Sequence, residues 1–389
     1  MCKNAKILLA VSALFTFSTG LSNIFTNVFF WRETKSLVVI AIYNLIIYLV
    51  TPITFVAAGF LAKKKSPVYS LRIGLIVYSI FYALILYIGG RGRIYIYLLG
   101  AVNGIAAAFY WLPFNVLCFD FTSINNRDSF NGFNGGLGGL ASIVGPITAA
   151  YIISRFKGFI GYRIVFFTSF VVFIILAFIS SIFKHDSSKG KLDIKKILIS
   201  DNDKWKIAKK ANFLWGLRDS TIMFIINILA IEVLKSELNL GILALTAALI
   251  TSGSCLLVQK IIKPERRRIA ILIGTTGAFM SMFILVFKLS YISMFLYSIV
   301  DALCLPFFMI QLYSSTFNVI DVLDDEDSRV EYMVSRDFML NGARAASVCL
   351  LIGLLFLFKE INAIKIYLIF LGIVPILSGY FLKKLQKII

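Results

Sequence analysis

The chain contains twelve long apolar stretches separated by short charged loops, and this pattern limits its possible folds more than any other feature. A helix needs about 20 apolar residues to cross the hydrocarbon core of a bilayer, which is about 30 Å thick. Hydrophobic residues make up 59% of the chain and include 36 Phe, whereas soluble domains contain about 45 to 50% apolar residues. The pattern therefore predicts a protein that crosses a membrane many times.

The predicted spans are α-helices. Lipid offers no hydrogen-bonding partner to an open backbone, and the stretches are continuously apolar, without the alternation of a β-barrel strand. The first stretch is too long for a signal peptide and further spans follow it, so we expect it to be retained. The approximate spans are 7–30, 37–61, 70–89, 94–118, 131–154, 160–183, 211–234, 239–262, 269–287, 290–316, 338–358 and 363–382.

The net charge of +19 does not form a single basic domain. Most Lys and Arg residues fall in alternate loops, and loops rich in these residues stay in the cytoplasm. We therefore expect both termini in the cytoplasm and no nucleic-acid partner. The single histidine, His185, lies in a loop, so we expect no metal site. The sequence contains no nucleotide-binding loop of the Walker type, and we expect no cofactor.

A polar stretch at 184–210 divides the chain into six spans and six spans. The predicted fold is an all-α membrane protein whose twelve transmembrane helices form two six-helix bundles, residues 1–183 and 211–389, joined by a cytoplasmic linker. Lys alternates with Leu and Ile in this linker, which is typical of a short amphipathic helix on the membrane surface. A solvated linker is the alternative.

The two halves share a short motif at matching places. Arg127 and Asp128 are followed by Asn-Gly, and so are Arg336 and Asp337, in each case before the next predicted span. The tripeptide Leu-Pro-Phe also occurs in the preceding span of both halves. Together with the six-plus-six layout, these matches favour duplicated parallel repeats, an arrangement that places a binding site at the interface of the repeats.

Two further motifs carry a resemblance to a known family. The span 131–154 has small residues or proline at a fixed spacing, and the loop after the second span has a glycine-initiated motif that ends in lysines. Their residues are Gly132, Ala141, Gly145, Pro146, Ala149 and Ala150 in the span, and Gly59, Phe60, Leu61, Ala62, Lys63 and Lys64 in the loop.

These patterns resemble the antiporter glycine pattern and the Gly-x-Leu-Ala-Asp-Arg/Lys signature of the major facilitator superfamily of transporters, over essentially the whole chain. The resemblance implies the two-bundle fold and transport by alternating access, and the glycine pattern favours export. Plain helix packing is the alternative reading of that pattern. Lys63 replaces the usual aspartate of the signature, which puts the charge relay of that motif in doubt.

Four ionisable residues stand out inside the predicted spans, namely Arg218, Asp219, Asp301 and Arg344. Each costs at least about 2.5 to 3.5 kcal/mol on insertion scales, so each is a candidate for function. Adjacent residues of a helix do not face each other, and we hypothesise that Arg218 contacts Asp301. Asp301 and Asp219 are the candidates for proton coupling, a permanent ion pair being the alternative. Arg344 either takes part in a conformational motif or extends to the lipid headgroups.

Polar residues of the first span lie on one helical stripe that includes Asn23 and Asn27. The resemblance implies that spans 1, 4, 7 and 10 line a central cavity, so both residues are substrate-binding candidates. Tyr110, Trp111 and Asn115 would add aromatic surface and an amide. Helix–helix hydrogen bonds for the asparagines and simple packing for the aromatic residues are the alternatives. The candidates in the other half are Arg218, Asp219 and Asp301.

The function predicted from these features is a secondary active transporter that moves a small solute, is driven by protons and exports its substrate. We expect a monomer in the lipid bilayer of a bacterial cytoplasmic membrane, since the chain is rich in Ile, Lys and Asn. An enzyme is not expected, because the spans contain no His and no zinc-protease motif. The alternative is a non-transporting or lipid-handling membrane protein on the same fold, such as a receptor, a scrambler or an assembly partner.

Overall fold

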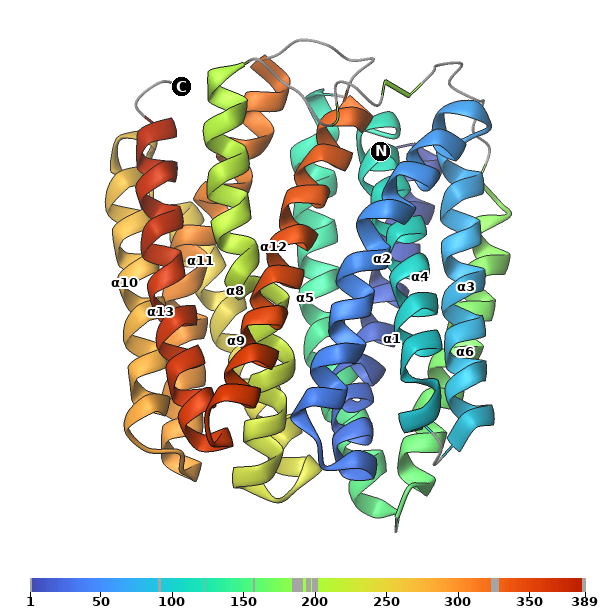
Figure 1. Ribbon diagram of the computed structural model, residues 1–389. Coiled ribbons are helices and arrows are strands. Elements are labelled where there is room, and N and C mark those ends of the chain that lie inside the picture. Colours follow the sequence, from blue (N-terminus) through green and yellow to red (C-terminus); the bar gives the residue numbers. More distant parts are fainter. Residues whose placement is uncertain are drawn as a thin grey trace. The chain divides into compact units, whose positions relative to one another are not determined.

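The computed structural model describes residues 2–89, 92–122, 124–156, 158–183, 192–193, 197, 202–322 and 329–386. In these ranges the chain forms long α-helices, one short 3-10 turn at Pro264–Arg266, and no strand, which confirms the predicted all-α membrane fold (Figure 1). The helices are α1 (Lys3–Thr34), α2 (Leu37–Lys64), α3 (Pro67–Ile88), α4 (Gly92–Asp120), α5 (Ile124–Arg155), α6 (Ile160–Ser180), α8 (Asp203–Leu234), α9 (Glu237–Ile261), α10 (Arg267–Phe287), α11 (Tyr291–Val322), α12 (Arg329–Leu357) and α13 (Glu360–Leu385).

Eleven helices in the described ranges are long and apolar enough to cross a membrane by length and composition. The helix outside this set is α8, which contains Arg218 and Asp219. Large apolar side chains such as Phe178 and Phe356 are 72% and 77% exposed. A surface of this kind is a liability in water but suits contact with lipid.

Several helices extend beyond the predicted spans. The span predicted at 131–154 belongs to α5, which begins at Ile124, and the one at 338–358 belongs to α12, which begins at Arg329. Both Arg-Asp motifs therefore lie inside a helix, and their predicted position before the helix was wrong. Hydropathy marks only the part of a helix that lies in hydrocarbon, whereas backbone hydrogen bonding continues through polar residues.

The two halves repeat the same helix ending. α1 and α8 are both 32 residues long, and they end at Lys35 and Lys235, which have φ values of 49° and 51°. In each case the backbone N–H of the lysine donates to the carbonyl four residues earlier, and a left-handed residue at this place is a common helix stop. The Leu-Pro-Phe tripeptides do not follow the repeat, because Pro113 is in the last third of α4 and Pro306 is near the middle of α11.

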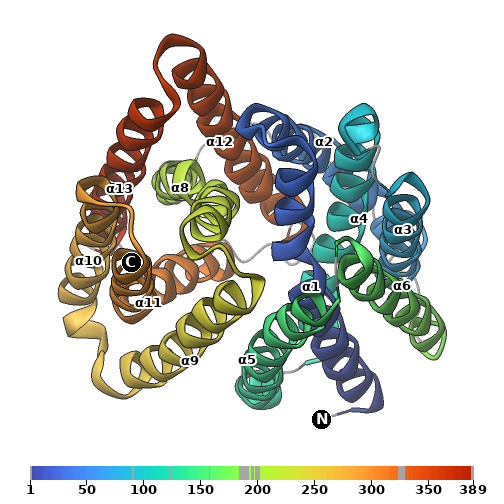
Figure 2. The same ribbon diagram turned by 90° about the horizontal axis from the view of Figure 1, so that it is seen from below.

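The chain consists of two compact units. The first comprises Met1–Asp193 together with Ser236–Gly241, and in it α1 packs on α5 and α6 while α2 and α3 pack on α4. The second comprises Ile194–Lys235 and Ile242–Ile389, in which α8 packs on α12 and α13 and α10 packs on α11 (Figure 2). The bundle limits predicted from the sequence remain a prediction, and most of the linker, including His185, lies outside the described residues.

The small-residue pattern of α5 brings this helix close to α1. A Cβ atom on Gly145 would lie 2.9 Å from the carbonyl oxygen of Phe17 and 3.0 Å from the backbone of Gly20. These are backbone atoms, which cannot rotate away as the end of a side chain can. Gly145 therefore sets the distance between α1 and α5, and Pro146 next to it lies inside α5.

We expect the substitution Gly145→Ala to lower the stability of the protein by about 1 to 3 kcal/mol, because overpacking at this contact forces α1 and α5 apart. Gly136→Ala is the matched control, since Gly136 lies in the same helix and a Cβ atom there would have no neighbour within 4 Å. Thermal unfolding of the purified variants in detergent measures the effect. Equal stability of the two variants would contradict the assignment.

Candidate functional site

The regular helical backbone of α8 is interrupted at Asp219, which directly follows Arg218. Asp219 has φ −38° and ψ −107°, whereas a regular α-helix has ψ near −42°. The hydrogen-bond ladder of the helix cannot continue unchanged through such a residue. The neighbouring side chains Arg218 and Asp219 project in different directions, and each of them reaches a different helix of the second unit.

Arg218 forms a buried ion pair in this unit. Its Nη2 atom donates to Oδ1 of Asp301 on α11 at 2.6 Å, and the hydroxyl of Ser281 on α10 donates to the same oxygen at 3.0 Å. The Arg218 side chain is 1% exposed and that of Asp301 is 15% exposed, and the guanidinium lies 5.8 Å from the ring of Trp215. The structure thus contains the contact that the sequence suggested, and it joins α8, α10 and α11.

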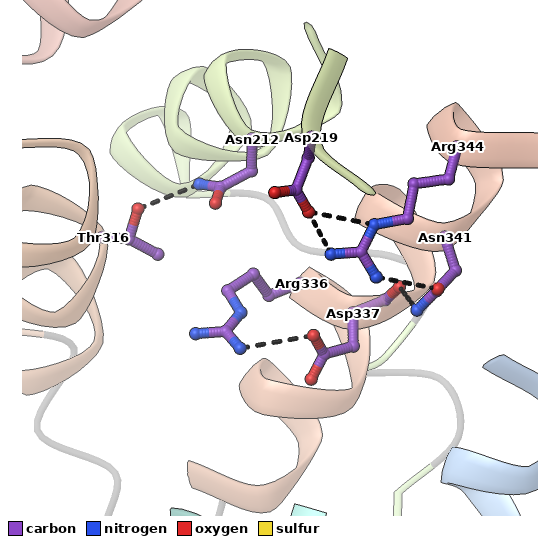
Figure 3. Close-up of polar contacts among 7 residues, drawn as sticks. All are labelled: Asn212, Asp219, Thr316, Arg336, Asp337, Asn341 and Arg344. Atoms are coloured by element: carbon purple, nitrogen blue, oxygen red, sulfur yellow. Dashed lines mark hydrogen bonds and ion pairs between the residues drawn. The ribbon is translucent and has the colours of Figure 1, made fainter. Parts of the chain in front are cut away.

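Asp219 forms a second pair, with Arg344 of α12. The Nε atom of Arg344 donates to Oδ2 of Asp219 at 3.1 Å, its Nη2 atom donates to the same oxygen, and its Nη1 atom donates to Oδ1 of Asn341 at 3.0 Å (Figure 3). The side chains of Arg344 and Asp219 are 20% and 23% exposed. Arg344 is therefore held inside the unit, and its predicted alternative, an extension to the lipid headgroups, was wrong.

The Arg-Asp motif of α12, Arg336 and Asp337, lies about two helical turns before Arg344 on the same helix. Arg336 donates from Nη2 to Oδ1 of Asp337 at 3.2 Å, and the amide of Asn341 donates to the carbonyl of Asp337 at 2.9 Å. Asp337, Asn341 and Arg344 are spaced four and three residues apart and so share one face of the helix, as Figure 3 shows. This face of α12 is charged and polar, and it contacts α8 through the pair of Arg344 with Asp219.

A hydrogen bond between two uncharged side chains lies earlier along α8 than these ion pairs. The amide of Asn212 donates to the hydroxyl of Thr316 on α11 at 2.9 Å (Figure 3). Both residues are almost fully buried. The bond holds α8 against α11. It lies about two helical turns before the interruption at Asp219, since a turn contains about 3.6 residues.

The polar stripe of α1 is divided between two environments. Asn27 is buried, and its Oδ1 atom accepts a hydrogen bond of 3.0 Å from the amide of Asn44 on α2. This bond joins two helices, as the packing alternative expects. Asn23 is exposed, and its role in a substrate cavity stays a prediction.

The aromatic candidates of α4 also differ from one another. Tyr110 is 1% exposed, and its ring stacks on Phe15 with ring centroids 3.4 Å apart and on Phe114 at 5.6 Å. Trp111 is 44% exposed, and Asn115 is partly buried. Trp111 and Asn115 therefore keep exposed surface, whereas the Tyr110 ring is covered by its neighbours. The role of the three residues in binding a solute stays a prediction.

The remaining motif residues have different environments. Gly59 is buried and Lys64 is exposed at the end of α2, while Lys63, which replaces the aspartate of the family signature, is 9% exposed. The side chains of Arg127 and Asp128 lie outside the described residues. Among the described residues no group of three or more His, Cys, Asp or Glu is placed to hold a metal ion.

The sequence did not identify Ser281 and Asn341 as hydrogen-bond partners of the ion pairs, in which Ser281 contacts Asp301 and Asn341 contacts Arg344. Asn341 carried a signal that could have been used, because it lies four residues after Asp337 and three before Arg344 and so shares one helical face with both. Ser281 carried none, since a single serine in an apolar helix is common and bonds its own backbone as readily.

We expect Arg218→Met to lower the free energy of unfolding by about 3 to 5 kcal/mol, because it leaves the buried Asp301 without its counter-charge. The double variant Arg218→Met, Asp301→Leu should recover a large part of this loss. Thermal unfolding in detergent measures both. The control is the exposed pair Lys235 and Glu232, 2.8 Å apart, whose replacement by Met and Leu should have little effect. Simple addition of the two single losses at Arg218 and Asp301 would argue against coupling.

Comparison with known proteins places these features in a family. Residues 6–320 match the model of the Major Facilitator Superfamily. The uncharacterized protein YqgE of Bacillus subtilis is 34% identical over 387 residues, which is 99% of this chain and 90% of that protein. An uncharacterized protein from Geobacillus stearothermophilus is 41% identical over 160 residues, 41% of this chain and 75% of that one.

Solved structures show the same fold at low identity. A bacterial homologue of the iron transporter ferroportin in an outward-facing state has a TM-score of 0.72 and 13% identity, with 99% of this chain and 100% of that one covered. A mutant of the nucleoside transporter NupG has a TM-score of 0.71 and 12% identity, with 98% and 100% covered. The human organic anion transporter MFSD10 has a TM-score of 0.68 and 12% identity, with 97% and 98% covered. The chain is thus a multi-pass membrane protein that belongs to the major facilitator superfamily of transporters.

Proposed function

We propose that the protein is a secondary active transporter that exports a small solute across the bacterial cytoplasmic membrane in exchange for protons. Its two bundles, 1–183 and 211–389, would alternate between two conformations, with both termini in the cytoplasm. Family membership supports transport, and the distribution of Lys and Arg supports the orientation. The antiporter-type spacing around Gly145 and Pro146 favours export.

The observation that carries the proposal is the pair of opposite charges at the interruption of α8. Arg218 pairs with Asp301 on α11, and Asp219 pairs with Arg344 on α12. Charged residues in a span are costly, so four of them at one place in a unit point to a task beyond packing. The two pairs tie a single irregular helix to two different neighbours.

This arrangement couples proton binding to helix movement. A proton on Asp301 or Asp219 would neutralise the carboxylate and so weaken its charge-assisted hydrogen bonds to arginine. α8 would then be released from α11 or from α12, according to which carboxylate is protonated. The Asp219 pair is the more accessible of the two, with about a fifth of each side chain exposed, and it is the better placed to exchange a proton with water.

The substrate class is open to a direct screen. The solved relatives carry iron, nucleosides or organic anions by their names, but identities of 12 to 13% make them a guide to the fold alone. A panel should therefore contain divalent metals, nucleosides, organic anions, sugars, amino acids and cationic drugs. A ligand at 100 times its dissociation constant should stabilise the folded protein by about 2.7 kcal/mol, which thermal unfolding detects.

We expect a hit from this panel to drive proton movement in proteoliposomes that contain the full chain and a pH-sensitive dye. Asp301→Asn should abolish the solute-dependent proton signal, because the amide cannot exchange a proton, although its Oδ1 atom can still accept a hydrogen bond from Arg218. Thermal unfolding of this variant checks that it remains folded. Asp219→Asn should weaken or abolish it for the same reason. The control is Asp203→Asn on the same helix, whose side chain is 91% exposed and which should transport normally.

The experiment also separates the proposal from its alternative. Solute movement that is equal in the wild type and in Asp301→Asn would remove proton coupling through this residue and leave transport itself intact. A panel without any hit, together with lipid movement between leaflets of the same vesicles, would favour a lipid-handling protein. Right-side-out and inverted vesicles compared under the same gradient distinguish export from import.

A further inference from the structure

Three lysines share one face at the beginning of α8. Lys209 and Lys210 follow Lys206 by three and four residues, and residues at this spacing lie side by side on a helix. They precede the predicted span 211–234, so we expect them at the membrane surface rather than in its core. Asp203 forms an ion pair of 3.5 Å with Lys206, but its side chain is 91% exposed, and such surface pairs contribute little.

Burial and the neighbouring positive charge of Lys206 lower the pKa of Lys209. The positive charges of these lysines are thus only weakly balanced by negative charge within the unit. An anion beside Lys209 would stabilise its charged form. This surface is separate from the ion pairs at Asp219 and Asp301, which lie farther along α8.

The same lysines line a pocket of about 410 Å³, and because its surface is almost wholly apolar they contribute mainly the hydrocarbon stems of their side chains. The rest of the wall consists of Phe213 and Leu214 from the next turns of α8, Met339 from α12 and Phe381 from α13. The Nζ atom of Lys210 lies 5.8 Å from the ring centroid of Phe381. The volume is in the range of about 300 to 1,000 Å³ that is usual for small-molecule sites.

The polarity of the pocket changes along the helix axis. Lys206 and Phe213 are seven residues apart, which is about 10 Å at 1.5 Å per residue. Positive charge therefore stands at the surface end, and hydrocarbon lines the end that points into the predicted span. A ligand that fills such a pocket has an anionic head and an apolar tail of a similar separation. Basic pockets between transmembrane helices bind anionic lipid headgroups for this reason.

We propose that this pocket, formed by the three lysines and by Phe213, Leu214, Met339 and Phe381, binds one anionic phospholipid of the surrounding bilayer. The phosphate diester would lie beside Lys209 and Lys210, and the first part of an acyl chain would pack on Phe213 and Leu214. A zwitterionic lipid fits less well, since its ammonium group would stand next to the lysines. The site holds α8, α12 and α13 together at one membrane face, and it is independent of the solute that the protein transports.

Titration of the full chain in detergent micelles tests the proposal, with native mass spectrometry to count bound lipids. Phosphatidylglycerol should bind with a stoichiometry of one at low concentration and raise the thermal unfolding temperature. Phosphatidylcholine with the same acyl chains should bind much more weakly. Equal binding of the two lipids would overturn the proposal, and so would competition by glycerol phosphate as effective as that by the whole lipid, which would indicate a site for a free anion.

Two variants locate the site. Lys209→Gln combined with Lys210→Gln should weaken phosphatidylglycerol binding about 30-fold, which corresponds to about fivefold for each basic residue removed. The control is Lys260→Gln combined with Lys263→Gln, which removes two exposed lysines from the same predicted membrane face and should leave binding unchanged. An equal loss in both would show a general charge effect and overturn the site.

The third variant, Leu214→Trp, keeps every charge and fills the apolar part of the pocket. It should also lose the tightly bound lipid, and it keeps the test valid if the lysine variant folds poorly. Unchanged lipid binding by a folded Leu214→Trp protein would contradict the assigned pocket. Transport activity does not enter these measurements, so their outcome is separate from that of the proposed function.

Discussion

The absence of water from the bilayer core is the constraint on which this structure depends. Every backbone N–H and C=O group in a span must find its partner within the segment, and the described part of the chain meets this requirement with long helices. The helices are largely held together by close packing, of which the approach of α5 to the backbone of α1 at Gly145 is an example. Lipid gives apolar side chains no preference for each other, so shape and hydrogen bonds decide which helices meet.

The helix α8 is the exception to this pattern, and its irregularity follows from the same constraint. It carries two adjacent charges that cannot be left unpaired in hydrocarbon. Arg218 pairs with Asp301, which also accepts a hydrogen bond from Ser281. Asp219 pairs with Arg344, which also donates to Asn341. Each pair uses a different neighbouring helix. An unpaired buried charge is far more costly than the pair itself. α8 is thereby joined to its unit by interactions that are strong when both partners are charged and weak when one is neutralised.

The fold and the membrane class followed from the sequence alone. Length and continuity of the apolar stretches determined the number of long helices, and the isolated charges Arg218, Asp219, Asp301 and Arg344 stood out because a span rarely tolerates them. The family resemblance agreed with the later match over residues 6–320. The helix limits were less predictable, since α5 and α12 continue through polar residues that hydropathy reads as loops.

Which side chains meet was decided only by the tertiary structure. The sequence suggested Arg218 with Asp301, but it left Asp219 without a partner and allowed Arg344 to extend toward the headgroups. It also gave Asn27 and Tyr110 the same candidate status as Asn23 and Trp111, although the first two are buried against Asn44 and Phe15. A one-dimensional pattern records the polarity and spacing of residues along a helix. The rotation of each helix about its axis, which determines the partner of every side chain, depends on the packing of all its neighbours.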